Sequence, residues 1–171
     1  MTNAGPGVTP GEQERYATRA YMRRAGMPES EFDAVGRYLD LLLSMMRSRV
    51  PFERVRARIA EEGFPPAFET LGLPFLPDDA AVWNFMAALI DYDPRQSLER
   101  IRVPVLALFG ADDAITAVTD SVVVYREAVR SDLLQVEVFA DADHRVQAGD
   151  PPALVDGYLE TLATFVLRAV A

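Results

Sequence analysis

Two side chains in the second half of the chain are of the types that acid–base catalysis requires. His144 is the only histidine among the 171 residues, and Asp113 precedes it. A carboxylate that accepts a hydrogen bond from the imidazole Nδ1–H holds the ring in one tautomer and stabilises the imidazolium, so that Nε2 can act as a general base. We therefore predict a catalytic pair in which Asp113 orients His144.

Each residue of this pair follows an apolar segment with the character of a buried strand. Residues 103–110 read VPVLALFG and lead to Asp113, whereas residues 135–139 read QVEVF and lead to His144. Helical periodicity over about residues 116–130 lies between them, which implies a parallel pair with a right-handed crossover. Because parallel strands bring their carboxyl ends to one edge of a sheet, we expect the two side chains to lie close together there.

Two other interpretations of these residues are open. Asp113 could cap the helix that follows it while His144 is a solvated loop residue, although their shared placement after strands favours the pair. Clustered carboxylates could instead bind a hard cation. The set available for this consists of Asp112, Asp113, Asp141, Asp143 and His144. A solvated acidic rim is a simpler interpretation of that cluster, and we expect no metal and no other cofactor.

The sequence contains no obvious nucleophile to accompany the pair. A catalytic serine of this kind normally stands in a G-x-S-x-G turn between a strand and a helix, and the chain has no such motif. All six serines lie in or beside predicted helices: Ser30, Ser44, Ser48, Ser97, Ser121 and Ser131. Losing the nucleophile of a triad costs about a million-fold in turnover. We therefore expect the chain alone to be inactive or weak.

The composition excludes several classes of function. A net charge of −9 argues against nucleic acid and against an anionic membrane surface as partners. The absence of cysteine excludes disulfides, thiolate catalysis and cysteine-ligated zinc, and the absence of lysine excludes Schiff-base chemistry. The N-terminus has no apolar leader and no segment reaches transmembrane length, so a cytoplasmic location is expected.

Residues 1–92 are predicted to form a helical region. Thr9 and Glu12 match a capping box, which predicts a helix over about residues 10–25. Two more helices follow by their apolar periodicity, and Asp78 is the expected N-cap of a fourth.

The fourth helix carries apolar side chains that are candidates for a substrate pocket above the pair. These candidate substrate-binding residues are Trp83, Phe85 and Met86. Helical spacing favours ordinary core packing for these residues, and a substrate pocket is the alternative.

The second half of the chain resembles the C-terminal part of the α/β-hydrolase superfamily, in particular its dipeptidyl-peptidase-like and esterase-like members. Gly110-Ala111-Asp112-Asp113 is similar to the G-x-x-D turn that carries the acid, and Asp143-His144 is similar to the terminal histidine loop. The resemblance implies an α/β fold in which a helical cap-like region, residues 1–92, is followed by a C-terminal core, residues 93–171. That core is a β-α-β-α unit with two parallel strands and a last helix over about residues 152–169.

The resemblance also implies an activity, namely hydrolysis of a small ester or amide through an acyl-serine intermediate. The chain would then be a truncated or split hydrolase whose serine comes from elsewhere. A two-stranded parallel sheet leaves open edges, which favour association. We therefore expect a homo-oligomer or a partner chain to cover those edges. A non-catalytic interaction module that uses the same edges is the alternative.

Overall fold

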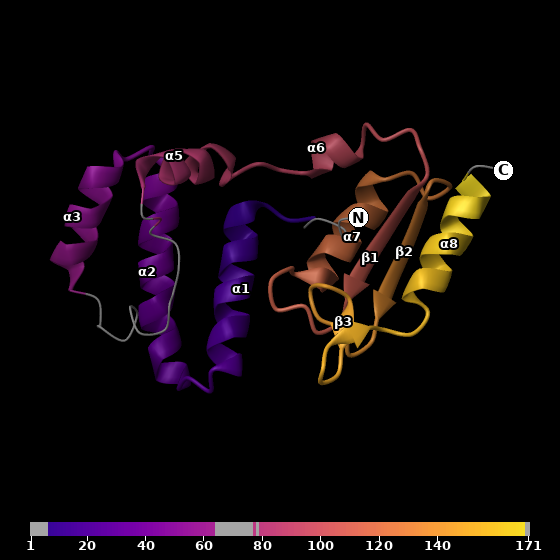
Figure 1. Ribbon diagram of the computed structural model, residues 1–171. Coiled ribbons are helices and arrows are strands. Elements are labelled where there is room, and N and C mark those ends of the chain that lie inside the picture. The colour runs from indigo at the N-terminus through magenta and orange to yellow at the C-terminus, as the bar shows by residue number, and fades with distance from the viewer. Residues whose placement is uncertain (1–6, 64–76, 78, 170–171) are drawn as a thin grey trace. The chain divides into compact units, whose positions relative to one another are not determined.

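The computed structural model describes residues 7–63, 77 and 79–169 of the chain. These residues divide into two compact units, a helical unit over Thr9–Tyr92 and a mixed unit over Asp93–Ala171 that also includes Gly7 and Val8 (Figure 1). Gly7 belongs with the mixed unit because its backbone N–H donates to Ser121 Oγ at 2.9 Å. The helical unit therefore begins at Thr9.

The helical unit contains four described helices: α1 (Pro10–Arg24), α2 (Glu29–Arg47), α3 (Phe52–Glu62) and α5 (Ala80–Leu89). The predicted capping box of α1 is confirmed, since Thr9 Oγ1 accepts from Glu12 N at 3.3 Å and Glu12 Oε2 accepts from Thr9 N at 2.9 Å. Gly63 ends α3 in the left-handed conformation, with φ 62°, which glycine adopts without steric penalty.

The predicted cap of the fourth helix was wrong by one residue. Asp79, in an extended conformation, caps α5, and its carboxylate accepts a hydrogen bond from Val82 N at 2.8 Å. Asp78 lies outside the described residues. Both aspartates have the right residue type, and the register of the helix decides which one is placed to reach the orphan N–H groups.

The core of the helical unit is built around α2 and α5. The apolar face of α2 packs against Trp83 and Ala87, and the indole Nε1–H of Trp83 donates to Val50 O at 2.9 Å. A buried tryptophan is expected to find such a partner, because an unsatisfied donor would oppose its burial.

The mixed unit contains the two predicted parallel strands. Its elements are α6 (Arg95–Leu98), β1 (Val105–Gly110), α7 (Val118–Ala128), β2 (Leu134–Phe139), β3 (Gln147–Ala148), β4 (Ala153–Leu154) and α8 (Tyr158–Ala169). Strand β1 pairs with β2 in parallel register, from Val105 opposite Leu134 to Gly110 opposite Phe139. The α/β class and the strand–helix–strand connection are thus confirmed. β1 begins after Pro104 because proline has no N–H to give to the ladder.

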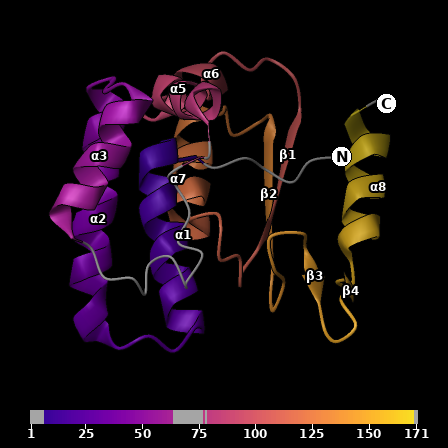
Figure 2. The ribbon, with the colours of Figure 1, turned by 60° about the vertical axis from the view of Figure 1, so that its left-hand side comes forward.

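Helix α7 packs against the parallel pair. Ala107 and Phe109 of β1 pack against Val118 and Val122 of α7, and the ring of Phe109 meets that of Tyr125 edge-on at 5.8 Å. α8 lies on the opposite side of the strand pair from α7 in both views (Figures 1 and 2), and the rings of Phe139 and Tyr158 lie 6.0 Å apart. None of the described helices is both long enough and apolar enough to span a membrane.

The last helix starts later than predicted. Residues 152–157 were expected to be helical, but α8 begins at Tyr158, and β4 occupies part of that segment. Gly157 has φ 80°, which a right-handed helix excludes, and Val155 N donates to Val146 O at 3.2 Å. The segment therefore returns to the His144 loop before the helix starts.

Candidate active site

Asp113 and His144 meet at the carboxyl ends of the parallel strands. The Oδ2 atom of Asp113 lies 2.8 Å from His144 Nδ1, a hydrogen-bond distance. Asp113 follows β1 and His144 follows β2, so the parallel pairing places both at the same edge of the sheet. The structure thus brings together the two residues that the sequence identified as an acid–base pair.

The carboxylate of Asp113 contacts three surrounding nitrogen atoms at hydrogen-bond distance. Its Oδ1 accepts hydrogen bonds from Ile115 N at 2.7 Å and from Thr116 N at 2.8 Å, which leaves Oδ2 for the imidazole. Asp113 is only 4% exposed, so water does not compete strongly for these contacts. A buried carboxylate fixed at both oxygens cannot turn away from the ring, and it presents negative charge where imidazolium would form.

The alternative interpretation, in which Asp113 caps the following helix, is wrong, although one oxygen of Asp113 does organise the loop before that helix. The bonds from Ile115 and Thr116 to Oδ1 close a turn directly after β1. The N-cap residue of α7 is Ala117, however, so Asp113 closes the preceding turn and does not cap the helix itself. The same side chain therefore shapes the loop with Oδ1 and contacts His144 with Oδ2.

Thr116 is a further member of the site that sequence reasoning missed. It is buried, and its Oγ1 lies 3.4 Å from His144 Nδ1, beside the oxygen of Asp113. A threonine three positions after an aspartate is common in turns, so no sequence signal distinguishes it. Its burial and its place on the Nδ1 side of the ring suit support of the imidazole, not attack on a substrate.

The loop after β1 and the loop before His144 lie in close contact at Gly110. A Cβ at position 110 would overlap the carbonyl oxygens of Ala142 and Asp143, so only glycine allows the loops to approach this closely. Asp112 N also donates to Ala142 O at 2.9 Å. The side chain of His144 nevertheless keeps 43% of its surface exposed, so the ring is open to a reactant on one side.

The acidic residues around the pair do not assemble into a cation site. In the part of the chain that the structure describes, no three His, Cys, Asp or Glu side chains are grouped so that they could hold a metal ion. Asp143, which was one member of the predicted cluster, uses its Oδ1 to accept from the backbone N–H groups of Arg145 and Gln147. The carboxylates of Asp113 and Asp143 thus bind backbone N–H groups of their own loops.

The candidate substrate-binding residues occupy different environments within the helical unit. Trp83 is fully buried in the core, Met86 packs against that core, and Phe85 is 65% exposed. Core packing therefore accounts for Trp83, and Phe85 is the one whose ring faces solvent. Since all three belong to the helical unit and the pair belongs to the mixed unit, a shared pocket stays a prediction.

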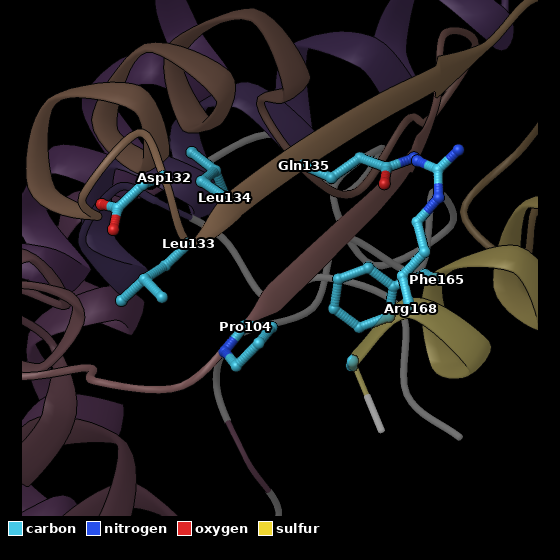
Figure 3. Close-up of a pocket in the computed structure, with 8 residues that line it drawn as sticks. Pro104, Asp132, Leu133, Leu134, Gln135, Phe165 and Arg168 are labelled. Atoms are coloured by element: carbon cyan, nitrogen blue, oxygen red, sulfur yellow. The ribbon is translucent and has the colours of Figure 1, made fainter. Parts of the chain in front are cut away.

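A cavity of about 260 Å³ lies in the mixed unit, but at the other end of the strands. It is lined by side chains that include Pro104 before β1, Leu134 at the start of β2, and Phe165 and Arg168 of α8 (Figure 3). Neither Asp113 nor His144 lines it. The candidate pair of Asp113 and His144 therefore lies apart from this cavity.

Ser121 illustrates why the serines of the mixed unit do not suggest a nucleophile. It lies within α7, is fully buried, and its Oγ accepts the hydrogen bond from Gly7 N. A buried hydroxyl that holds a neighbouring segment cannot meet a substrate.

No protein-family model, no curated protein and no solved structure matches this chain. A function must therefore be inferred from the geometry of the site.

Proposed function

We propose that this chain provides the acid–base pair of an α/β-hydrolase, with Asp113 as the orienting acid and His144 as the general base. The observation that carries the proposal is the 2.8 Å contact between Asp113 Oδ2 and His144 Nδ1, made by a buried carboxylate whose other oxygen is held by two backbone N–H groups. This arrangement suits a base that must be correctly oriented and must carry positive charge transiently.

The proposed reaction is hydrolysis of a small ester or amide. The imidazole Nε2 takes the proton of a serine hydroxyl while the serine oxygen adds to the carbonyl carbon. Collapse of the tetrahedral intermediate breaks the bond to the leaving alkoxide or amine, which receives the proton from Nε2. Water then attacks the acyl-serine in the same way, with His144 again as base.

The fold supports this proposal through the order of its elements. A helical unit precedes a strand, a helix, a second strand and a final helix, the order expected for a cap followed by the C-terminal core of such a hydrolase. The serine and the oxyanion donors then belong to a segment other than these 171 residues. Among the described residues β1 pairs only with β2, and we propose that a partner chain or a second copy extends the sheet there.

The test is hydrolysis of an activated ester, p-nitrophenyl acetate, by the folded chain. A positioned base that activates water contributes about 10²–10⁴-fold, so slow hydrolysis should be measurable and should disappear in His144→Ala. Equal rates for the two proteins would refute the role of His144 as a base.

A fluorophosphonate probe followed by intact-mass measurement locates the nucleophile. We expect no adduct on the folded chain. A stoichiometric adduct that depends on His144 would place the activated serine within this chain and contradict the proposed division between segments.

A non-catalytic interaction module is the second candidate, and one observation favours it. Helix α8 has no buried residue, and it exposes Leu159, Val166 and Leu167, the last to 69%. Apolar side chains grouped in this way on a helix are typical of surfaces that bind another polypeptide. If self-association measured by sedimentation is lost in Leu167→Glu but is unchanged in His144→Ala, while neither variant alters ester hydrolysis, the module is the better description.

A further inference from the structure

We propose that Asp143 is a positioning residue, which holds the turn carrying His144 so that the imidazole meets Asp113. A catalytic role for this positioning depends on the proposed function. The hydrogen bonds of Asp143 that support the inference do not involve a nucleophile. Asp143 directly precedes His144, and its side chain is engaged with the backbone on the far side of that residue.

Asp143 closes the His144 turn with both its side chain and its backbone. Its Oδ1 accepts from Arg145 N at 2.8 Å and from Gln147 N at 3.0 Å. Its own N–H donates to Gln147 O at 2.8 Å, and its carbonyl accepts from Val146 N at 2.9 Å. His144 lies inside this small ring of hydrogen bonds, so the direction of its Cα–Cβ bond depends on it.

The turn is strained, which indicates that it needs such support. Val146 has φ 57°, a left-handed conformation that β-branched residues rarely adopt, and it is fully buried. A residue in this region persists only where its surroundings enforce it. The bond from Val146 N to Asp143 O, and the bond from Val155 N to Val146 O, provide that enforcement.

The same turn is attached to the loop that carries the acid. The carbonyl of Asp143 faces Gly110, where a Cβ would overlap it, and Asp112 N bonds to Ala142 O. Asp113 follows within three residues of Gly110. Asp143 therefore connects the placement of the base to the placement of the acid, and a shift of the turn would open the contact between Asp113 and His144.

The experiment is nuclear magnetic resonance of the His144 imidazole, whose signals are unambiguous because the chain has a single histidine. In the native chain we expect Nδ1 to carry a proton that the contact with Asp113 protects from exchange with water. We expect Asp143→Ala to accelerate that exchange by about tenfold or more, the factor associated with losing one charge-assisted hydrogen bond. Asp143→Asn keeps an acceptor oxygen at the same position and should retain the protected proton.

Asp141→Asn is the matched control, because it removes the same charge from the same loop two residues before Asp143. It should leave the Nδ1 exchange unchanged. If Asp143→Ala does not fold, as judged by a cooperative melt, Asp143→Ser replaces it. This variant should also accelerate the exchange, since the shorter serine side chain is a poorer acceptor for two N–H groups than the aspartate.

Unchanged Nδ1 exchange in folded Asp143→Ala would overturn the proposal, and so would equal acceleration in the Asp143→Asn and Asp141→Asn variants, which would show an effect of charge alone. These outcomes are separate from those of the proposed function. If ester hydrolysis proves independent of His144 while the Asp143 variants behave as expected, then Asp143 positions the imidazole and the hydrolase assignment fails.

Discussion

Gly110 lies so close to the carbonyl of Ala142 that a Cβ at position 110 would overlap it. This close approach brings the end of β1 against the loop before His144. A substitution at position 110 therefore tests whether the site requires this backbone contact. An alanine there must push the two loops apart, because the atoms that it would meet are backbone atoms that cannot rotate away.

We expect Gly110→Ala to destabilise the mixed unit by about 1–3 kcal/mol and to expose the His144 Nδ1 proton to exchange. Amide hydrogen exchange of residues in β1 and β2 measures the first effect separately from the helical unit. Gly36→Ala is the control, because position 36 lies within α2 with nothing inside 4 Å of the added carbon. That variant should stabilise the helical unit by about 0.5–1 kcal/mol. A Gly110→Ala variant as stable as the native chain would contradict the close approach.

Trp83 should behave as a core residue. Trp83→Phe removes the donor to Val50 O and reduces the buried volume, so we expect a loss of about 1–3 kcal/mol in the unfolding free energy measured by urea and circular dichroism. Phe85→Ala, at an exposed position of the same helix, should change stability by less than about 0.5 kcal/mol. If Phe85→Ala weakens binding of an ester substrate without changing stability, its predicted role in substrate binding is supported.

The stability of the helical unit should fall as the pH rises from about 4.5 to about 7. Burial raises the pKa of Glu14 from 4.5 to about 7, and its Oε2 is buried without a hydrogen-bond partner among the described residues. The folded state thus binds a proton in this range that the unfolded state has released, so the stabilising effect is complete below about 4.5 and is lost as the pH passes 7.

Glu14→Gln isolates this effect from the other titrating groups. The native chain should lose about 1–2 kcal/mol relative to the variant between these two pH values, after allowance for the solvent that reaches part of the side chain. Urea denaturation of both proteins across the pH range measures the difference, with Trp83 fluorescence as a probe of this unit. Parallel stability profiles for the two proteins would show that Glu14 is ionised normally.

The sequence predicted the site best where periodicity and strand order decide the geometry. Two apolar strands separated by a helix were sufficient to bring Asp113 and His144 to one edge, because parallel pairing leaves few alternatives. The late start of α8 was not predicted, since the apolar spacing around Val155 also fits a helix. The hydrogen bond from Val155 N to Val146 O, which joins different parts of the loop, and the pairing of β4 with β3 hold the segment in a non-helical conformation.

The supporting residues of the site could not be predicted because they act through the backbone. Thr116 and Asp143 have no periodic signal, and their roles depend on which N–H groups the folded loops bring within reach. The left-handed conformation of Val146 runs against its residue type, so local propensity predicts the opposite. Functional loops commonly depart from local preferences in this way.

Asp113→Asn should separate the stability of the site from its chemistry. The amide oxygen of asparagine can still accept from Ile115 N and Thr116 N, so the turn after β1 should persist, with a loss of about 1–3 kcal/mol from the bond to His144. The amide NH₂ would then face His144 Nδ1, which must accept a hydrogen bond, and the proton of the neutral imidazole moves to Nε2. A base that carries its proton on the attacking nitrogen is disabled, and about 10⁴-fold of triad activity depends on this tautomer.

Nitrogen-15 chemical shifts of the single imidazole measure this change directly, because the two tautomers differ in which ring nitrogen is protonated. We expect Nδ1–H in the native chain and Nε2–H in Asp113→Asn, together with loss of His144-dependent ester hydrolysis. Asp112→Asn removes the same charge one residue away and should retain the Nδ1–H tautomer. A native tautomer in folded Asp113→Asn would mean that the contact at 2.8 Å does not orient the ring, and the assignment of Asp113 as the acid would then be wrong.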